Sequence, residues 1–301
     1  MAKVRVGLSG WSYDGWRGEF YPDDLPRRRE LEYASRRFSS LEINGSFYSL
    51  LEPDTYRGWY ERTPSDFRFA VKGSRFITHN KRLKDPVTPL ANFLASGVLA
   101  LKEKLGPIVW QLPPSFGFDA ERIGAFLDAL PRDTEAAARL AARHDSRVAG
   151  RSHTEIERRR RLRHALEVRD ESFFCPEFVR LLRRSGTALV FSDSADWPLR
   201  EEVTAGWIYI RLHGSRETYA SPYKDEELKN WARKIAAWHD ARQPEAAKRI
   251  TERKPPRRKG RDVYVYFDND QHAHAPRDAD RLLERLLALG ADLGRRPQDD
   301  G

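Results

Sequence analysis

The sequence of 301 residues contains one cysteine, Cys175. A single thiol cannot form an intramolecular disulfide, and it excludes metal sites built from several cysteines. Long apolar runs are also missing: none approaches the roughly 18 residues of a membrane span, and the first residues lack the apolar region of a signal peptide. We therefore expect a protein of the reducing cytoplasm that has no membrane partner.

Two phosphate-binding motifs are absent as well. Residues 7–11, at the end of the first predicted strand, read Gly-Leu-Ser-Gly-Trp and lack the Gly-x-Gly-x-x-Gly spacing of dinucleotide-binding folds. The Gly-x-x-x-x-Gly-Lys-Ser/Thr pattern of phosphate-binding loops does not occur either. Both absences argue against an open, doubly wound nucleotide-binding sheet.

Charge is abundant and unevenly placed. The chain has 54 basic and 45 acidic residues and a net charge of +9. Residues 147–169 hold eight basic and three acidic residues, and residues 242–261 hold nine and two, so the remaining chain is slightly acidic. These stretches predict basic insertions at about 131–163 and 243–261, the first with surface helices over Arg132–Ala149 and Glu155–Arg163.

Strand and helix patterns alternate along the chain. Eight segments rich in β-branched and aromatic residues predict buried strands: Val4–Leu8, Leu41–Asn44, Arg68–Lys72, Ile108–Leu112, Ala165–Arg169, Ala188–Ser192, Trp207–Leu212 and Asp262–Phe267. Helices are predicted at Arg28–Phe38, Asp54–Arg62, Pro89–Leu105, Asp119–Leu130, Pro176–Arg184, Asp225–Arg242 and Arg277–Leu289. Eight such units favour an α/β fold of the (β/α)₈ TIM-barrel class, a single domain over residues 1–294 with a disordered tail at 295–301.

Polar residues stand where the predicted strands end, which is where TIM barrels carry their functional sites. Three pairs separated by two positions point to one side of a strand: Glu42/Asn44, Glu167/Arg169 and Arg211/His213. Lys72, Gln111, Asp193, Asp268, Asn269 and Asp270 end or follow other strands. These charges either seal the barrel end by pairing with one another or form a ligand site, and their number favours the site.

The mixture of residue types narrows the chemistry. Lys72, Arg169 and Arg211 suit carboxylate or phosphate oxygens, so the predicted ligand is a small anionic or phosphate-bearing molecule. Four residues are candidate catalytic groups for acid–base work, namely Glu42, Glu167, Asp193 and His213. We predict no cofactor and no metal, since the cations would repel one; a divalent ion, if present, would take Glu42, Glu167, Asp193, His213 and Asp270 as ligands.

Aromatic residues follow the first two strands and predict either a hydrophobic lid or a wall on which a ring stacks. The candidate substrate-binding residues are Trp11, Tyr13, Asn44, Tyr48, Lys72, His79, Gln111, Arg169, Arg211, Tyr219, Asn269 and Asp270.

Eight short motifs occur in a characteristic order. Examples are Gly-Leu-Ser-Gly-Trp-Ser-Tyr at 7–13, Glu-Ile-Asn-Gly-Ser-Phe-Tyr at 42–48, Phe-Ala-Val-Lys at 69–72, Gln-Leu-Pro-Pro-Ser-Phe at 111–116, Glu-Val-Arg at 167–169 and Tyr-Val-Tyr-Phe-Asp-Asn-Asp at 264–270. In these motifs the chain resembles the DUF72, or YecE-like, family. The resemblance implies a TIM barrel and leaves the reaction open. Asp268 stands where the family pattern has Asn, which makes the last loop more anionic. Ala273 stands where the pattern has Gly.

Three interpretations of function remain open at the level of sequence. The first is an enzyme acting on a phosphate-bearing substrate, by phosphoester hydrolysis (nuclease-like cleavage included) or by isomerisation of a sugar phosphate. The second is a non-catalytic nucleic-acid-binding protein that uses Arg158–Arg161 and Arg257–Arg261. The third is a scaffold whose basic insertion docks an acidic protein.

Overall fold

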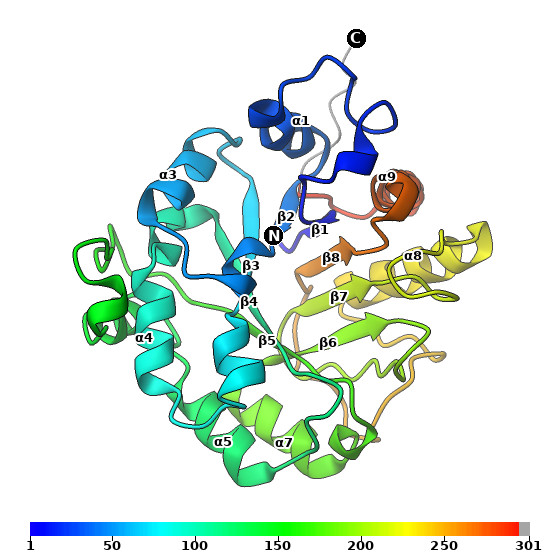
Figure 1. The fold of residues 1–301 in the computed structure, drawn as a ribbon. Helices are drawn as coiled ribbons and strands as arrows, with labels where there is room; N and C mark the ends of the chain where they lie inside the picture. Colours follow the sequence, from blue (N-terminus) through cyan, green and yellow to red (C-terminus); the bar gives the residue numbers. More distant parts are fainter. Residues whose placement is uncertain (295–301) are drawn as a thin grey trace. The chain divides into compact units, whose positions relative to one another are not determined.

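A computed structural model describes residues 1–294 and shows eight parallel strands that follow one another around a closed barrel in sequence order (Figure 1). The strands are β1 (Val4–Ser9), β2 (Ser40–Ile43), β3 (Arg68–Lys72), β4 (Leu105–Gln111), β5 (His164–Glu167), β6 (Ala188–Asp193), β7 (Ile208–Leu212) and β8 (Val263–Phe267). This confirms the predicted α/β TIM-barrel class. Every residue of β2, β7 and β8 is buried. β8 accordingly reads as a continuous apolar and aromatic run, whereas β2 and β7 also carry the buried charges of Glu42 and Arg211.

Helices connect most of the strands. They are α1 (Glu30–Arg37), α2 (Gly45–Tyr48), α3 (Pro53–Glu61), α4 (Val87–Ala95), α5 (Ala120–Ala129), α6 (Thr134–Ala141), α7 (Pro176–Ser185), α8 (Asp225–His239) and α9 (His274–Ala288). Asp119 and Asp133 begin α5 and α6 by accepting hydrogen bonds from the backbone N–H groups of Arg122 and Ala136. No helix within residues 1–294 is long and apolar enough to cross a membrane.

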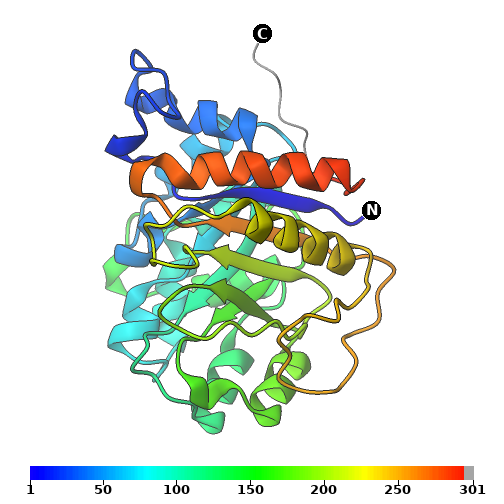
Figure 2. The same ribbon diagram turned by 90° about the vertical axis from the view of Figure 1, so that its right-hand side faces the viewer.

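The chain folds as two compact units. The first comprises Met1–Glu42 and the residues from Ala188 onward, and the second comprises Ile43–Thr187. In the first unit β8 pairs with both β1 and β7, and α9 packs along β1 and β8 with α8 beside it (Figure 2). In the second unit β4 pairs with β3 and β5, α4 packs on α6, and α5 packs on α7. The single domain expected from the sequence stays a prediction, and the expected tail at 295–301 lies outside the described residues.

The helix predicted over Pro89–Leu105 is wrong in its extent. The α-helix ends at Ala95, and a 3₁₀ segment over Val98–Lys104 follows Gly97. Gly97 has a φ of 120°, and a Cβ there would come within 2.6 Å of the Pro53 Cα. The close approach of α3 therefore needs a glycine at this position, and its backbone breaks the helix.

The two helices predicted in the first basic insertion are also largely wrong. Within 132–149 only Thr134–Ala141 forms an α-helix, with a 3₁₀ turn at Ser146–Val148, and residues 155–163 contain none. The 155–163 segment instead pairs with the start of α6: the Thr134 N–H donates to the Arg160 carbonyl at 2.9 Å, and the Leu162 N–H donates to the Arg132 carbonyl at 2.9 Å. These long-range backbone bonds replace the local helical ones that the arginine-rich sequence favours.

The second basic insertion runs between the end of α8 and the start of β8 (Figure 2). Two buried glutamates hold it in place. Glu201 accepts from the Lys248 N–H at 2.7 Å and from Nζ of the buried Lys234 at 2.7 Å. Glu202 accepts from the backbone N–H groups of Ile250 and Thr251 at 2.9 and 3.0 Å. The loop thus lies at the amino-terminal end of β8, whereas the polar strand ends lie at the carboxyl ends.

Candidate functional site

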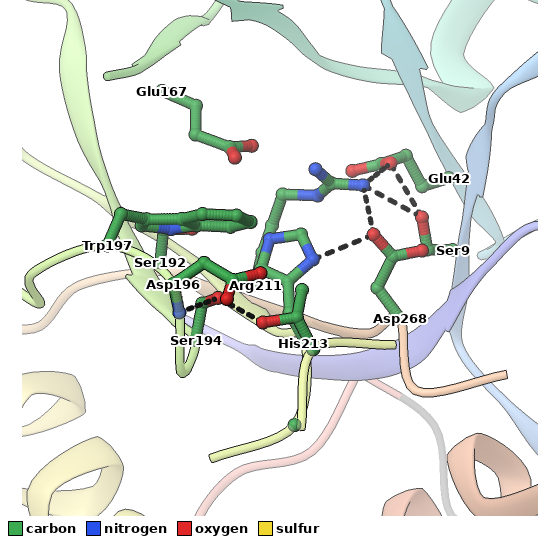
Figure 3. A network of polar contacts seen from close by, with 12 residues as sticks. Ser9, Glu42, Glu167, Ser192, Ser194, Asp196, Trp197, Arg211, His213 and Asp268 are labelled. Carbon is green, nitrogen blue, oxygen red and sulfur yellow. Dashed lines mark hydrogen bonds and ion pairs between the residues drawn. The ribbon is translucent and has the colours of Figure 1, made fainter. Parts of the chain in front are cut away.

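A buried carboxylate–arginine network lies at the carboxyl ends of strands in the first unit (Figure 3). Glu42 stands beside Ser9 in the β1–β2 register, and its Oε1 accepts from the Ser9 hydroxyl at 2.9 Å and from Arg211 Nη2 at 2.8 Å. Its Oε2 accepts from the Tyr209 hydroxyl at 2.6 Å. The Glu42 and Arg211 side chains are 0% and 1% exposed, so both charges are held by protein groups instead of water.

Asp268 and His213 extend this network (Figure 3). Arg211 Nη2 donates to Asp268 Oδ2 at 2.9 Å, and the same oxygen lies 2.9 Å from His213 Nδ1. The imidazole of His213 therefore lies directly beside the Asp268 carboxylate. We refer to Ser9, Glu42, Tyr209, Arg211, His213 and Asp268 as the Arg211 network.

Aromatic rings enclose His213. The ring of Trp197 meets the imidazole edge-on at a centroid distance of 5.3 Å, and the ring of Tyr219 does so at 5.4 Å. Trp197 is fixed in turn by its indole N–H, which donates to the Ser192 hydroxyl at 2.8 Å. His213 is fully buried, so it orients Asp268 rather than presenting its own ring to solvent.

Asp270 lies two residues beyond Asp268, in the loop that follows β8. Burial, reinforced by the negative charge of Asp268, raises the pKa of Asp270 to about 8. The nearby Tyr13 hydroxyl opposes this rise, although its hydrogen bond is donated to the Ser9 carbonyl at 2.6 Å. Burial together with the Asp270 charge raises the pKa of Tyr13 well above its usual value. The loop backbone is fixed by the Trp16 indole N–H, which donates to the Asp270 carbonyl at 3.0 Å. The environment of Asp270 therefore favours its protonated form.

Two predicted site residues are engaged by the surrounding fold. Asp193 accepts a hydrogen bond from the Trp231 indole of α8 at 3.1 Å. Burial raises the pKa of Asp193, and the hydrogen bonds from Trp231 and Tyr223 partly offset that rise. Asn269 donates to Asp278 at 2.9 Å and to the Ser221 carbonyl at 3.1 Å. Asp193 thus ties the end of β6 to α8, and Asn269 ties the loop after β8 to α9.

In the second unit, Glu167 ends β5 and pairs with the nearby Arg169. Arg169 donates to Glu167 Oε1 through Nε at 3.0 Å and through Nη2 at 2.9 Å, and Glu167 is 0% exposed. Gln111 is buried beside Glu167 in the β4–β5 register. The pair predicted from the Glu-x-Arg spacing is thus present as an ion pair.

Four cations of the same unit act electrostatically on His79. Burial, reinforced by the charges of Lys72, Arg75, Arg169 and Arg82, lowers the pKa of His79 to about 4. His79 lies in a π-helical turn over Phe76–Asn80, and Arg82 and Leu83 just beyond it have positive φ values of 48° and 65°. Irregular helices and strained residues of this kind are frequent at functional sites. We refer to Lys72, Arg75, Arg82 and Arg169 as the His79 cluster.

Aromatic residues after β2 adjoin this cluster. The Lys72 ammonium lies 4.4 Å from the centroid of the Phe47 ring, and the His79 ring meets Phe47 edge-on at 5.1 Å. Tyr48, which was predicted to stack on substrate, is 68% exposed. Asn44 lies just outside β2, where it precedes α2.

Sequence reasoning missed several members of these clusters. Ser9 and Tyr209 act through Glu42, from which they are separated by 33 and 167 residues, so no local pattern marks them. Asp268 was visible as a strand-end residue but had no assigned role. Trp11, a predicted stacking residue, accepts a hydrogen bond at its carbonyl from the Tyr21 hydroxyl at 2.5 Å. Within residues 1–294 no group of three or more His, Cys, Asp or Glu side chains is arranged to hold a metal ion.

Fold and site together define a (β/α)₈ barrel protein with charged, largely buried strand ends. A family model described as "Protein of unknown function DUF72" matches residues 5–300. The chain belongs to the DUF72 family.

Relatives and solved structures agree with this assignment. The chain is 30% identical over 129 residues to the UPF0759 protein YecE of Escherichia coli K12, which covers 42% of this chain and 44% of that protein. It is 26% identical over 125 residues to the UPF0759 protein YunF of Bacillus subtilis, which covers 40% and 43%. Each match spans less than half of the relative's length.

Two crystal structures share the fold. A DUF72 family protein from Thermotoga maritima MSB8 matches with a TM-score of 0.70 and 24% identity over 95% of this chain and 99% of that one. A DUF72 family protein from Enterococcus faecalis V583 matches with a TM-score of 0.65 and 17% identity over 94% and 95%.

Proposed function

We propose that this protein is an enzyme that acts on an anionic, phosphate-bearing substrate, with phosphoester hydrolysis as its reaction. The observation that carries the proposal is the His79 cluster. Burial and the charges of four cations together lower the pKa of the partly buried His79 to about 4, so the cations add a positive potential at this site even though Arg169 is paired with Glu167. Arginine forks match phosphate oxygens in two-point hydrogen bonding, and phosphate binding would relieve this potential.

Within the Ile43–Thr187 unit, the proposed hydrolysis forms a P–O bond to water and breaks the P–O bond to the leaving group, whose oxygen takes a proton as the attacking water loses one. In the other unit Glu42 is assigned a positioning role, since three donors already occupy its oxygens.

Calorimetric titration with inorganic phosphate and turnover of aryl phosphate mono- and diesters test binding and reaction separately. The double variant Arg75→Ala/Arg82→Ala should weaken phosphate binding at least tenfold and lower ester turnover with it, while Arg180→Ala, an exposed arginine outside the cluster, should leave both unchanged. Equal phosphate binding in all variants would refute the anion site.

Two alternatives are outcomes of the same experiments. Turnover of a sugar phosphate without ester cleavage would indicate an isomerase. The nucleic-acid alternative rests on the basic insertions, where Arg159 is paired with Asp133 at 2.7 Å and Arg160 lies 3.5 Å from Glu157 and 3.7 Å from Glu103. Such pairing reduces the charge that Arg158–Arg161 offers to a phosphate backbone. Oligonucleotide binding that is lost in Arg257→Ala/Arg258→Ala but kept in the His79-cluster variant would support it.

A further inference from the structure

A cavity in the Ile43–Thr187 unit adjoins Arg75 of the His79 cluster. Its volume is about 180 Å³, and the residues that matter for its chemistry are Tyr48, Ser74, Phe76, Ile77, Pro89 and Arg147. Arg75, a member of the cluster, lies in the chain between two of these lining residues, Ser74 and Phe76. The cavity and the cluster therefore share one turn of backbone.

Two aromatic side chains of this cavity are exposed. Tyr48 is 68% exposed and Phe76 is 43% exposed, whereas the neighbouring Phe47 is buried. Leaving a phenylalanine in water forfeits the free energy that its burial would provide, and exposed apolar groups gathered around a hollow mark binding sites. The Arg147 guanidinium lies 6.0 Å from the centroid of the Phe76 ring, at a distance typical of cation–π contacts.

The walls of this cavity are held in place before any ligand arrives. The Phe76 N–H donates to the Ser74 hydroxyl at 3.2 Å, and the Ile77 N–H donates to the Ser74 carbonyl at 3.0 Å. Arg147 is held by Asp145, with which it makes a 2.5 Å ion pair. Asp145 is itself fixed by Asn92 of α4, which donates from Nδ2 to Asp145 Oδ1 at 3.0 Å. The first basic insertion thus contributes a fixed arginine to this cavity.

We propose that this cavity binds the planar aromatic ring of a nucleobase whose phosphate is held by the His79 cluster, so that the substrate is a nucleotide or a nucleotide ester. The inference rests on the proposed function for the phosphate and on the cavity for the ring. Phenyl rings, a guanidinium and a proline all offer flat surfaces that stack on a base, whereas an acyl chain would gain nothing from the arginine. The positive charges of Arg75 and Arg147 complement the phosphate of such a ligand.

Titration with four probes separates the two claims: inorganic phosphate, ribose 5-phosphate, AMP and adenosine. AMP should bind at least tenfold more tightly than ribose 5-phosphate, as base stacking on an aromatic side chain requires. Phe76→Ala should abolish that ratio without changing phosphate binding, and Phe76→Trp should restore it. Val87→Ala, an exposed apolar residue that does not line the cavity, is the matched control.

The outcomes are distinct. If phosphate, ribose 5-phosphate and AMP bind equally, the cavity binds no base, and the nucleotide inference fails while the proposed function stands. If no phosphate-bearing probe binds, the proposed function fails. In that case, adenosine binding that is lost in Phe76→Ala would still support base binding in the cavity. If adenosine does not bind either, both the proposed function and the nucleotide inference fail.

Discussion

At the scale of single residues, the most consequential feature is one proton. Asp268 is paired with Arg211 and lies 2.9 Å from His213 Nδ1, whereas Asp270, two residues later, is largely buried and close to the Asp268 charge. Burial and that charge favour the protonated form of Asp270.

The raised pKa of Asp270 predicts how stability depends on pH. In the unfolded chain Asp270 loses its proton near its usual pKa of 3.8, but in the folded protein it does so at about 8. Between these values the folded state binds the extra proton, so this residue's contribution to the free energy of unfolding falls with rising pH, by up to about 1.4 kcal/mol per unit, and levels off above pH 8.

Urea unfolding of wild type and Asp270→Asn between pH 5 and 9 measures this contribution. The difference between the two curves should decline with pH and flatten above about 8. A difference that does not change with pH would show that Asp270 is ionised throughout the range.

At the scale of elements, the sequence patterns predicted the strands better than the helices. The strands are short buried runs whose composition reflects a local environment, and β3 has the predicted bounds of Arg68–Lys72. The helix predicted at 155–163 does not form because the Thr134 N–H donates to the Arg160 carbonyl within that segment. The helix predicted from Pro89 ends early because α3 comes close to the backbone at Gly97. Both failures come from contacts between segments distant in sequence, which propensity does not contain.

Contacts between distant segments also limited the prediction of the candidate site. Strand-end polarity predicted Glu42, Arg211, Glu167 and Arg169, and their role in a functional site stays a prediction. It did not point to Ser9 or Tyr209, which contact Glu42 from distant positions in the chain, or to Phe76, which lies in an irregular turn.

Two glycines of the Ile43–Thr187 unit provide a matched test of these element boundaries. Gly97→Ala should destabilise the protein by more than about 1 kcal/mol, because its φ of 120° disfavours a side chain and the new Cβ would meet Pro53 and Tyr56 at 2.6 and 2.7 Å. Gly58→Ala, inside α3, would meet only an arginine side-chain atom at 3.8 Å and should stabilise the protein by about 0.5–1 kcal/mol. Denaturant unfolding of both variants checks the signs, and equal effects would contradict the boundary at Gly97.

At the scale of the whole molecule, the net charge of +9 does not by itself describe the anion site. Most of the excess comes from 147–169 and 242–261, and several of those arginines are paired with carboxylates. Lys72, Arg75 and Arg82 lie outside both stretches. Screening by salt should therefore weaken nonspecific attraction to the insertions more than binding at the partly buried cluster.

The pKa of His79 is the most direct measure of the central claim, that the His79 cluster binds an anion. NMR titration of the imidazole signal, assigned by its loss in His79→Gln, should give a pKa of about 4 in chloride. Saturating sulfate, a dianion over this pH range, should raise that pKa by about one unit or more at matched ionic strength, because an anion among the cations favours the imidazolium. An identical His79 pKa in chloride and sulfate would contradict the claim.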